Sequence, residues 1–251
     1  MFPQVLLKNR KYRLFEGLPH GNLTCAFSMR KHGNMSLVYG DTKHALNNRK
    51  AFLRELDINY EDLVCARQIH GNNIKYVKEQ DRGKGALSYD SAIADTDGLI
   101  TDKRNLPLAV FTADCLPIFL YELKTPSIAL VHAGWRSSKE NIAARAIELM
   151  QEEFNIKIKD LYVGFGPGIR GCCYEVGRDF GNFFPDELRQ RAGHYYLDLV
   201  KINKKQLLRL GVRDINISDV KICTSCQNED LFSYRKEGSS CGRMMSVAML
   251  D

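Results

Sequence analysis

The sequence predicts an α+β (mixed α/β) protein in which mixed β-sheets are flanked by helices within a single domain, residues 1–251. The length of 251 residues fits one sizeable domain with a substantial core. The composition, 44% hydrophobic and 26% charged residues, is that of a globular protein. Short apolar runs rich in β-branched and aromatic residues occur beside longer amphipathic patterns, which indicates strands and helices in the same fold.

Helical spacing of apolar residues first occurs over residues 43–57, a segment that ends at a polar break. Residues 62–79 have the pattern of two strands joined by a His-Gly turn. The polar, glycine-bearing stretch 80–92 predicts a mobile loop. Apolar runs then predict four short buried strands, which cover 97–102, 106–114, 116–122 and 127–133.

The clearest helix is predicted over 137–153, because its apolar residues form one stripe. Ser137 or Ser138 can cap this helix, and Glu140 lies near the position that a capping box requires. The remaining elements follow in order: a strand over 161–166, a helix over 200–210 closed by Gly211, and strand-like sequence over 220–251.

Charge patterning argues against nucleic acid as a partner, and the lack of any run of eighteen apolar residues predicts that the chain has no membrane span. The formal net charge is +6, from 36 Lys and Arg against 30 Asp and Glu, and no block of five like charges occurs. A basic stripe interleaved with aromatic residues is absent, so we expect a surface that mildly favours anionic small molecules. The apolar stretch at the N-terminus is too short and too soon broken by charge to be a secretory signal, which predicts a cytoplasmic protein.

Eight cysteines are many for this length, and in a cytoplasmic chain they indicate free thiols, metal binding or catalysis. The adjacent pair Cys172-Cys173 is unsuited to a disulfide with itself, because that geometry is strained. The Cys223-x-x-Cys226 pair could form half of a structural zinc site together with Cys241. Partnerless histidines are expected at the surface: His20, His32, His44 and His194.

Three side chains that could carry chemistry follow apolar runs and precede a Gly or Pro break. They are His70 in IHG, Cys115 in DCLP and His132 in VHAG. Two imidazoles and a thiolate suit zinc with one open coordination position, although the spacing alone also fits ordinary histidines and a core cysteine. Asp114, directly before Cys115, could orient a ligating histidine, act as a general acid or base, or cap a turn.

The combination of motifs resembles a known family. RQIHG, DGLIT, TADCLP, VHAGWR, the GPGI turn, CTSC, FSYR and CGR occur in the order typical of the laccase-domain proteins. This family is also called multicopper polyphenol oxidase-like, purine nucleoside phosphorylase-like or peptidoglycan editing factor. The resemblance implies that His70, Cys115 and His132 bind zinc. Ser137 departs from the family pattern, which usually has Gly at this position.

The resemblance further implies phosphorolysis of adenosine, inosine and S-methyl-5′-thioadenosine, and deamination of adenosine. The implied partners are purine nucleosides and phosphate. Catalysis is then assigned to Asp114, Cys115 and His132, with Asp114 as the carboxylate that shuttles protons. Trp135 could stack on a base or pack in the core. Candidate contacts to substrate are Arg49, Arg235 and Arg243 for phosphate, and Gln68 and Asp97 for the nucleoside or a supporting loop.

Three alternatives remain open at this point. Cys115 could act with His132 or His70 as a metal-free cysteine hydrolase, which would suit editing of peptidoglycan precursors. Copper in place of zinc would make a polyphenol oxidase, but six histidines without a His-x-His pair argue against multicopper chemistry. A binding protein without turnover is the third alternative. The sequence does not indicate an oligomeric state.

Overall fold

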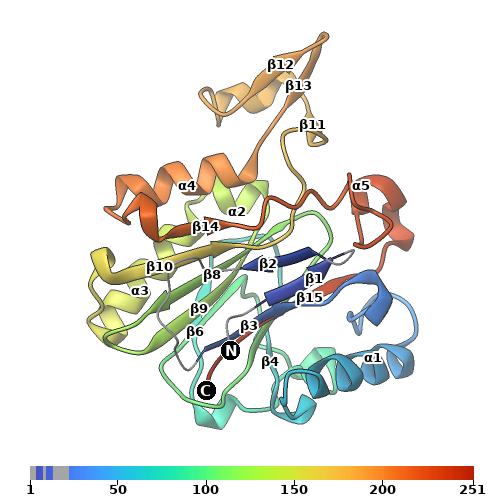
Figure 1. Ribbon diagram of the computed structural model, residues 1–251, viewed down its shortest axis with the longest axis vertical. Helices are drawn as coiled ribbons and strands as arrows, with labels where there is room; N and C mark the ends of the chain where they lie inside the picture. The colour runs from blue at the N-terminus through green and yellow to red at the C-terminus, as the bar shows by residue number, and fades with distance from the viewer. Residues whose placement is uncertain (1–3, 8–9, 14–22) are drawn as a thin grey trace.

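Two β-sheets lie face to face, and helices cover the outer face of each (Figure 1). The computed structural model describes residues 4–7, 10–13 and 23–251, with side chains for 23–251. The prediction of an α+β fold with mixed sheets flanked by helices is confirmed. His20 lies outside the described residues. Among the residues that the structure describes, no helix has both the length and the apolar character needed to cross a bilayer.

The larger sheet has six strands in the order β14-β10-β8-β9-β6-β5. Each of its central strands β10, β8, β9 and β6 is antiparallel to its neighbours among them, while β14 pairs parallel with β10 and β5 pairs parallel with β6 at the two edges. The strands are β5 (Ile74–Tyr76), β6 (Gly98–Thr101), β8 (Leu116–Glu122), β9 (Ser127–Ala133), β10 (Leu161–Phe165) and β14 (Ile217–Asp219).

The second sheet has four strands in the order β3-β15-β7-β4. They are β3 (Leu23–Phe27), β4 (Val64–Cys65), β7 (Leu108–Thr112) and β15 (Met244–Leu250). Two small sheets complete the described part of the chain. Their strands are β1 (Gln4–Leu7) with β2 (Arg10–Arg13), and β11 (Glu175–Val176), β12 (Arg189–Arg191) and β13 (His194–Tyr196).

Alternating apolar residues explain the stacking of layers, because successive side chains of a strand point to opposite faces. In β8, Phe119 packs between the two sheets, whereas Ile118 and Leu120 pack toward the helices. In β15, Met244 faces the six-stranded sheet and Met245 faces the other side. Strands buried on both faces have continuous apolar runs, which is the reason that β8 and β9 were identifiable in the sequence.

Five α-helices occur in the described residues: α1 (Thr42–Arg54), α2 (Trp135–Lys139), α3 (Ile142–Phe154), α4 (Leu199–Arg209) and α5 (Tyr234–Glu237). Helix α1 packs on the four-stranded sheet, and α3 and α4 pack on the six-stranded sheet. Helices α1 and α4 match the segments predicted from the sequence. Asp198 caps α4, and Gly211 follows it with φ +96°.

The single helix predicted over 137–153 is wrong, because the segment forms two helices, α2 and α3. The break lies at Asn141, whose φ of +56° belongs to the left-handed region that interrupts a right-handed helix. Ser137 and Ser138 are therefore buried inside α2 instead of capping a helix, and Gly134 takes the capping position. The strand-like reading of 220–251 holds only for β15, since residues 223–240 form turns and α5.

Short 3-10 turns join these elements. They cover Arg30–His32, Tyr60–Asp62, Glu79–Asp81, Tyr89–Ser91, Ile158–Asp160, Arg178–Asn182, Asp214–Asn216 and Gly238–Ser240. Of the partnerless histidines, His44 and His194 are exposed as expected. His32 is half-buried instead, because its ring packs 5.0 Å from that of Phe52.

Candidate functional site

The Asp114-Cys115 pair lies where the chain passes from one large sheet to the other. Strand β7 belongs to the four-stranded sheet and β8 to the six-stranded sheet, so residues 113–115 cross between them. Asp114 has φ +92°, a conformation that a non-glycine residue adopts only at an energetic cost. Such strain at a polar residue is typical of a functional site.

His70, Cys115 and His132 converge in space, although they come from three separate segments. Their ligand atoms all lie within 4.8 Å of one another. The two imidazole rings stand nearly perpendicular at 78°, with centroids 4.8 Å apart. Pairing of Leu116 with Ala133 in the β8–β9 ladder sets Cys115 beside the His132 segment, while the loop between β4 and β5 supplies His70 in a left-handed conformation with φ +62°.

The Asp97 carboxylate accepts hydrogen bonds from both histidine segments. Its Oδ1 accepts hydrogen bonds from His132 Nδ1 at 2.8 Å and from the backbone N–H of His70 at 2.9 Å. Its Oδ2 accepts the backbone N–H groups of Gly71 at 2.7 Å and Ile69 at 3.1 Å. The bond to Nδ1 leaves Nε2 of His132 as the nitrogen free to bind a metal ion.

The electrostatics of the group favour the deprotonated thiol. Burial raises the pKa of Cys115, but the neighbouring His132 and His70 rings outweigh burial and lower that pKa to about 6. Burial lowers the pKa of His132, yet the Cys115 sulfur and the Asp97 carboxylate together raise it to about 9. A thiolate is the form of cysteine that binds metal, and metal displaces the proton from the imidazole.

The three donors fit a zinc ion. Zn–N distances of about 2.0–2.1 Å and a Zn–S distance of about 2.3 Å put tetrahedral donors about 3.3–3.6 Å apart, which small side-chain rotations can reach from the observed separations. Gly134 leaves room for them, since an added Cβ would lie 3.1 Å from Cys115 Sγ and 3.3 Å from His70 Cδ2. Three protein ligands leave the fourth position open.

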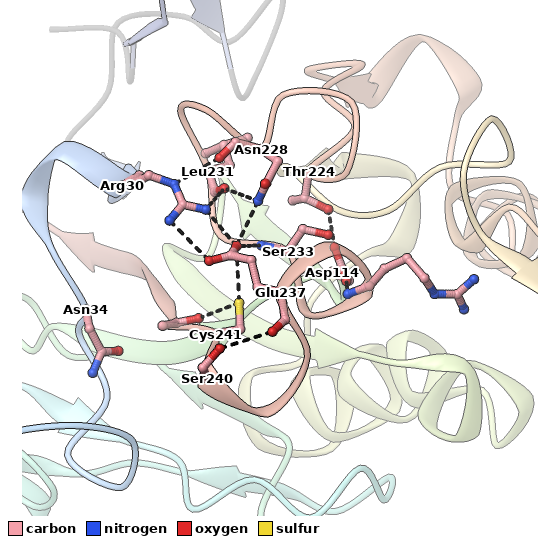
Figure 2. Close-up of polar contacts among 12 residues, drawn as sticks. Arg30, Asn34, Asp114, Thr224, Asn228, Leu231, Ser233, Glu237, Ser240 and Cys241 are labelled. Atoms are coloured by element: carbon pink, nitrogen blue, oxygen red, sulfur yellow. Dashed lines mark hydrogen bonds and ion pairs between the residues drawn. The ribbon is translucent and has the colours of Figure 1, made fainter.

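The carboxylate of Asp114 is held by the segment that follows β14. Its Oδ1 accepts the Thr224 hydroxyl at 2.5 Å, and its Oδ2 accepts the backbone N–H of Arg235 at 2.7 Å (Figure 2). Glu237 fixes that segment by accepting Arg30 Nη2 at 2.6 Å (Figure 2). Burial raises the pKa of Glu237, but Arg30 and other donors lower it to about 2.

A cavity of about 550 Å³ opens over this group. Its walls combine the three candidate ligands and Asp114 with aromatic and cationic side chains, which is the composition expected of a site for a flat, partly charged ligand. The aromatic and cationic lining residues are Tyr39, Tyr89, Phe111, Trp135, Tyr174 and Tyr234, and Arg49, Arg136, Arg235 and Arg243.

Comparison with known proteins decides the family. The family described as multi-copper polyphenol oxidoreductase laccase matches residues 24–251, which is most of the chain. The chain belongs to this laccase family. The family match covers His70, Cys115 and His132 together.

Relatives of the same laccase family agree in fold as well as sequence. The purine nucleoside phosphorylase YlmD of Geobacillus stearothermophilus is 35% identical over 223 residues, covering 85% of this chain and 81% of that protein. The crystal structure of YlmD from Geobacillus stearothermophilus superposes with a TM-score of 0.87 at 32% identity, covering 94% and 98% of the two chains. The adenosine deaminase RL5 of an unknown prokaryotic organism is 29% identical over 215 residues, 82% of each chain.

Two of the residues predicted to contact substrate, Arg49 and Gln68, form hydrogen bonds to the protein backbone. Arg49 is buried, and its guanidinium donates to the carbonyls of Met35, Gly85 and Ala86 at 2.8–2.9 Å. Gln68 makes two hydrogen bonds to the backbone of Phe111. Arg49 and Gln68 therefore support the cavity wall, as Asp97 supports the histidines, and whether they also contact substrate stays a prediction.

Arg235 and Arg243 lie on the cavity wall, where the Arg235 guanidinium makes one hydrogen bond and the Arg243 guanidinium makes two. Arg235 Nη1 donates to Glu175 O at 2.8 Å. The Arg243 guanidinium lies 4.1 Å over the Tyr39 ring and donates to the carbonyl of Cys241 at 2.6 Å. These contacts hold both side chains on the cavity wall, and whether they also bind phosphate stays a prediction.

Sequence reasoning missed two side chains that line this cavity and one that supports a lining residue. Arg136 follows Trp135 in VHAGWR and lines the cavity, so that motif already contained the signal. Tyr174 follows the cysteine pair, and only the tertiary structure brings it to the cavity. Thr224 lies inside the CTSC motif, and its hydroxyl donates a hydrogen bond to Asp114. The motif was interpreted through its two cysteines alone. Trp135 lines the cavity and also packs 5.0 Å from the Phe180 ring.

Replacing Gly134 with alanine will weaken zinc binding by about tenfold, the range typical of disturbed ligand orientation. The new Cβ would press on Cys115 Sγ at 3.1 Å and on His70 at 3.3 Å. Zinc affinity is measured by competition with a chromophoric chelator. Gly181→Ala is the matched control, because its Cβ would meet only Leu188 at 3.5 Å. Equal zinc affinity in the two variants would contradict the crowding argument.

Proposed function

We propose that this chain is a zinc-dependent purine nucleoside enzyme. It phosphorolyses adenosine, inosine and S-methyl-5′-thioadenosine, and it deaminates adenosine. One observation carries the proposal: His70, Cys115 and His132 converge on the wall of a cavity lined with aromatic and cationic side chains. The similarity to a purine nucleoside phosphorylase and to an adenosine deaminase supports it.

The cavity supplies what phosphorolysis requires. A phosphate oxygen attacks C1′ of the ribose, the C1′–N9 bond breaks, and the purine leaves with a proton on its ring nitrogen. Arg136, Arg235 and Arg243 hold the phosphate dianion through paired N–H donors, because guanidinium geometry matches phosphate. Phe111 and Tyr174 give the purine apolar faces to pack against.

Deamination uses the same pocket without phosphate. Water adds at C6 of adenosine, and ammonia leaves to give inosine. A zinc ion held by His70, Cys115 and His132 would supply the Lewis acid that activates this water. Asp114 lies beside these donors, and each of its oxygens keeps a lone pair that can take a proton from water and return it to the leaving amine.

The experiment that tests this proposal is a product assay on protein of known zinc content. With adenosine alone we expect inosine and ammonia, and with phosphate added we expect adenine and ribose 1-phosphate as well. Removing zinc with a chelator will stop both reactions, and returning zinc will restore them. No product from any of the three nucleosides, in protein that holds stoichiometric zinc, would overturn the proposal.

A metal-free cysteine hydrolase is the second candidate, favoured by the contact of Cys115 with two imidazoles. Such an enzyme would act on peptidoglycan precursors. Inhibitors distinguish the two functions. The activity of a Cys-His dyad survives a chelator and is abolished by thiol alkylation. The activity of the zinc enzyme is abolished by a chelator, and bound zinc protects its thiol from alkylation.

A further inference from the structure

We propose a second metal site in this protein, a four-thiolate structural zinc site separate from the histidine-bearing group. Its ligands are Cys172, Cys173, Cys223 and Cys226. The site replaces the ligand set suggested by the sequence, because Cys241 is not part of it. The thiol of Cys241 instead donates to Gly242 O at 3.2 Å and lies 3.6 Å from the Glu237 carboxylate. Nothing in this proposal depends on nucleoside chemistry.

Backbone hydrogen bonds bring the two cysteine pairs together. The turn after β10 and the turn after β14 lie side by side, because Gly168 N donates to Ile222 O at 3.3 Å and Thr224 N donates to Gly168 O at 3.2 Å. Arg170 joins the same turns, since its guanidinium donates to Ile222 O at 3.1 Å and to Asp219 at 2.8 Å. A metal ion would therefore find its ligands already ordered.

The sulfur positions fit one tetrahedral ion. Cys226 Sγ lies 3.5 Å from Cys172 Sγ and 3.3 Å from Cys173 Sγ, and all four sulfurs lie within 4.8 Å of one another. Zn–S bonds of about 2.3 Å put tetrahedral sulfurs about 3.8 Å apart. An iron–sulfur cluster spreads its cysteines over several metal atoms and requires a wider cage, so the compact thiol group favours zinc.

The closeness of the thiols also favours a cation at this place, because four sulfur atoms lie within 4.8 Å of one another. A divalent ion takes the place of the thiol protons and offsets the repulsion between neighbouring thiolates. Cys172 and Cys226 are exposed, which gives the ion a path from solvent, while Cys223 is buried and anchors the site to the core.

A zinc ion at this position would stabilise two turns that support the wall of the 550 Å³ cavity. Cys173 is followed by Tyr174, which lines the cavity. Cys223 is followed by Thr224, whose hydroxyl bonds Asp114. A metal ion that joins these turns would fix the positions of Tyr174 and Thr224 relative to each other. A disulfide from Cys226 to one neighbour is the competing use of the same thiols, and it would leave two sulfurs without a partner.

Metal counting on purified full-length protein, prepared under reducing conditions with zinc in the medium, tests the site. We expect two zinc ions per wild-type chain. The His70→Ala/His132→Ala variant and the Cys172→Ser/Cys226→Ser variant will each retain one. Cys25→Ala, a core cysteine outside both groups, is the control that retains two. Cobalt loaded into the histidine variant will show the sulfur-to-metal charge-transfer absorption of a tetrahedral thiolate site.

The outcomes are distinguishable even where a cysteine variant fails to fold, because the cobalt spectrum is recorded on the folded histidine variant. A histidine variant that binds no zinc, or the absence of the thiolate charge-transfer band in its cobalt form, would overturn the proposal. So would a mapped disulfide at Cys226 in freshly reduced and reoxidised protein that binds no second zinc. The zinc content of the histidine variant tests the four-thiolate site alone, and nucleoside turnover of the wild type tests the proposed function, so the two proposals fail independently.

Discussion

Cys115→Ala will lose the zinc ion of the histidine-bearing group and, with it, more than about 100-fold of the turnover of adenosine, a larger loss than a change beyond the direct ligands causes. Cys115 is the one sulfur donor of that group, and its neighbours hold it as a thiolate. His70→Ala and His132→Ala are expected to behave alike. Turnover and bound zinc are measured on the same preparations.

The control for Cys115→Ala is again Cys25→Ala, whose thiol is buried in the core away from the cavity. Circular dichroism will show the same fold for both variants, since one buried sulfur contributes little to a core of this size. Full turnover in any of the three ligand variants would remove that residue from the site. Full turnover in Cys115→Ala would also exclude the cysteine hydrolase.

Asp97→Asn will lower zinc affinity by about 10- to 100-fold, although Asp97 never contacts the ion. Both carboxylate oxygens accept two N–H donors each, so the amide NH₂ of asparagine would face two donors whichever way it turned. Each donor left without an acceptor costs about 1–3 kcal/mol, so the two donors together predict a loss of stability of about 2–6 kcal/mol as well. Zinc competition and urea unfolding of the zinc-free protein measure the two effects.

Asp95→Asn provides the matched control for Asp97→Asn. Asp95 lies two residues away, its side chain is 67% exposed, and its ion pair with Arg67 at 3.8 Å contributes little. We expect its zinc affinity and its urea midpoint to equal those of the wild type. If Asp97→Asn kept wild-type zinc affinity while losing stability, Asp97 would be a structural residue of the loop and have no role in orienting His132.

Strands β8 and β9 could be predicted from the sequence because they are buried on both faces and carry unbroken apolar runs. The break between α2 and α3 was not, because a stripe of apolar residues continues through it and only Asn141 in the left-handed region ends the first helix. Local periodicity reports which face of a segment is buried, but it does not report a change in helix direction.

The sequence by itself determined the class of fold and, through its motifs, the identity of His70, Cys115 and His132 as one group. Tertiary structure alone decided how the side chains are held: Asp97 accepts a hydrogen bond from His132, Thr224 donates one to Asp114, and two turns bring Cys172 and Cys173 to Cys223 and Cys226. The physical reason is that motifs specify residue types along the chain, whereas hydrogen bonds and metal geometry depend on distances between segments that only folding brings together.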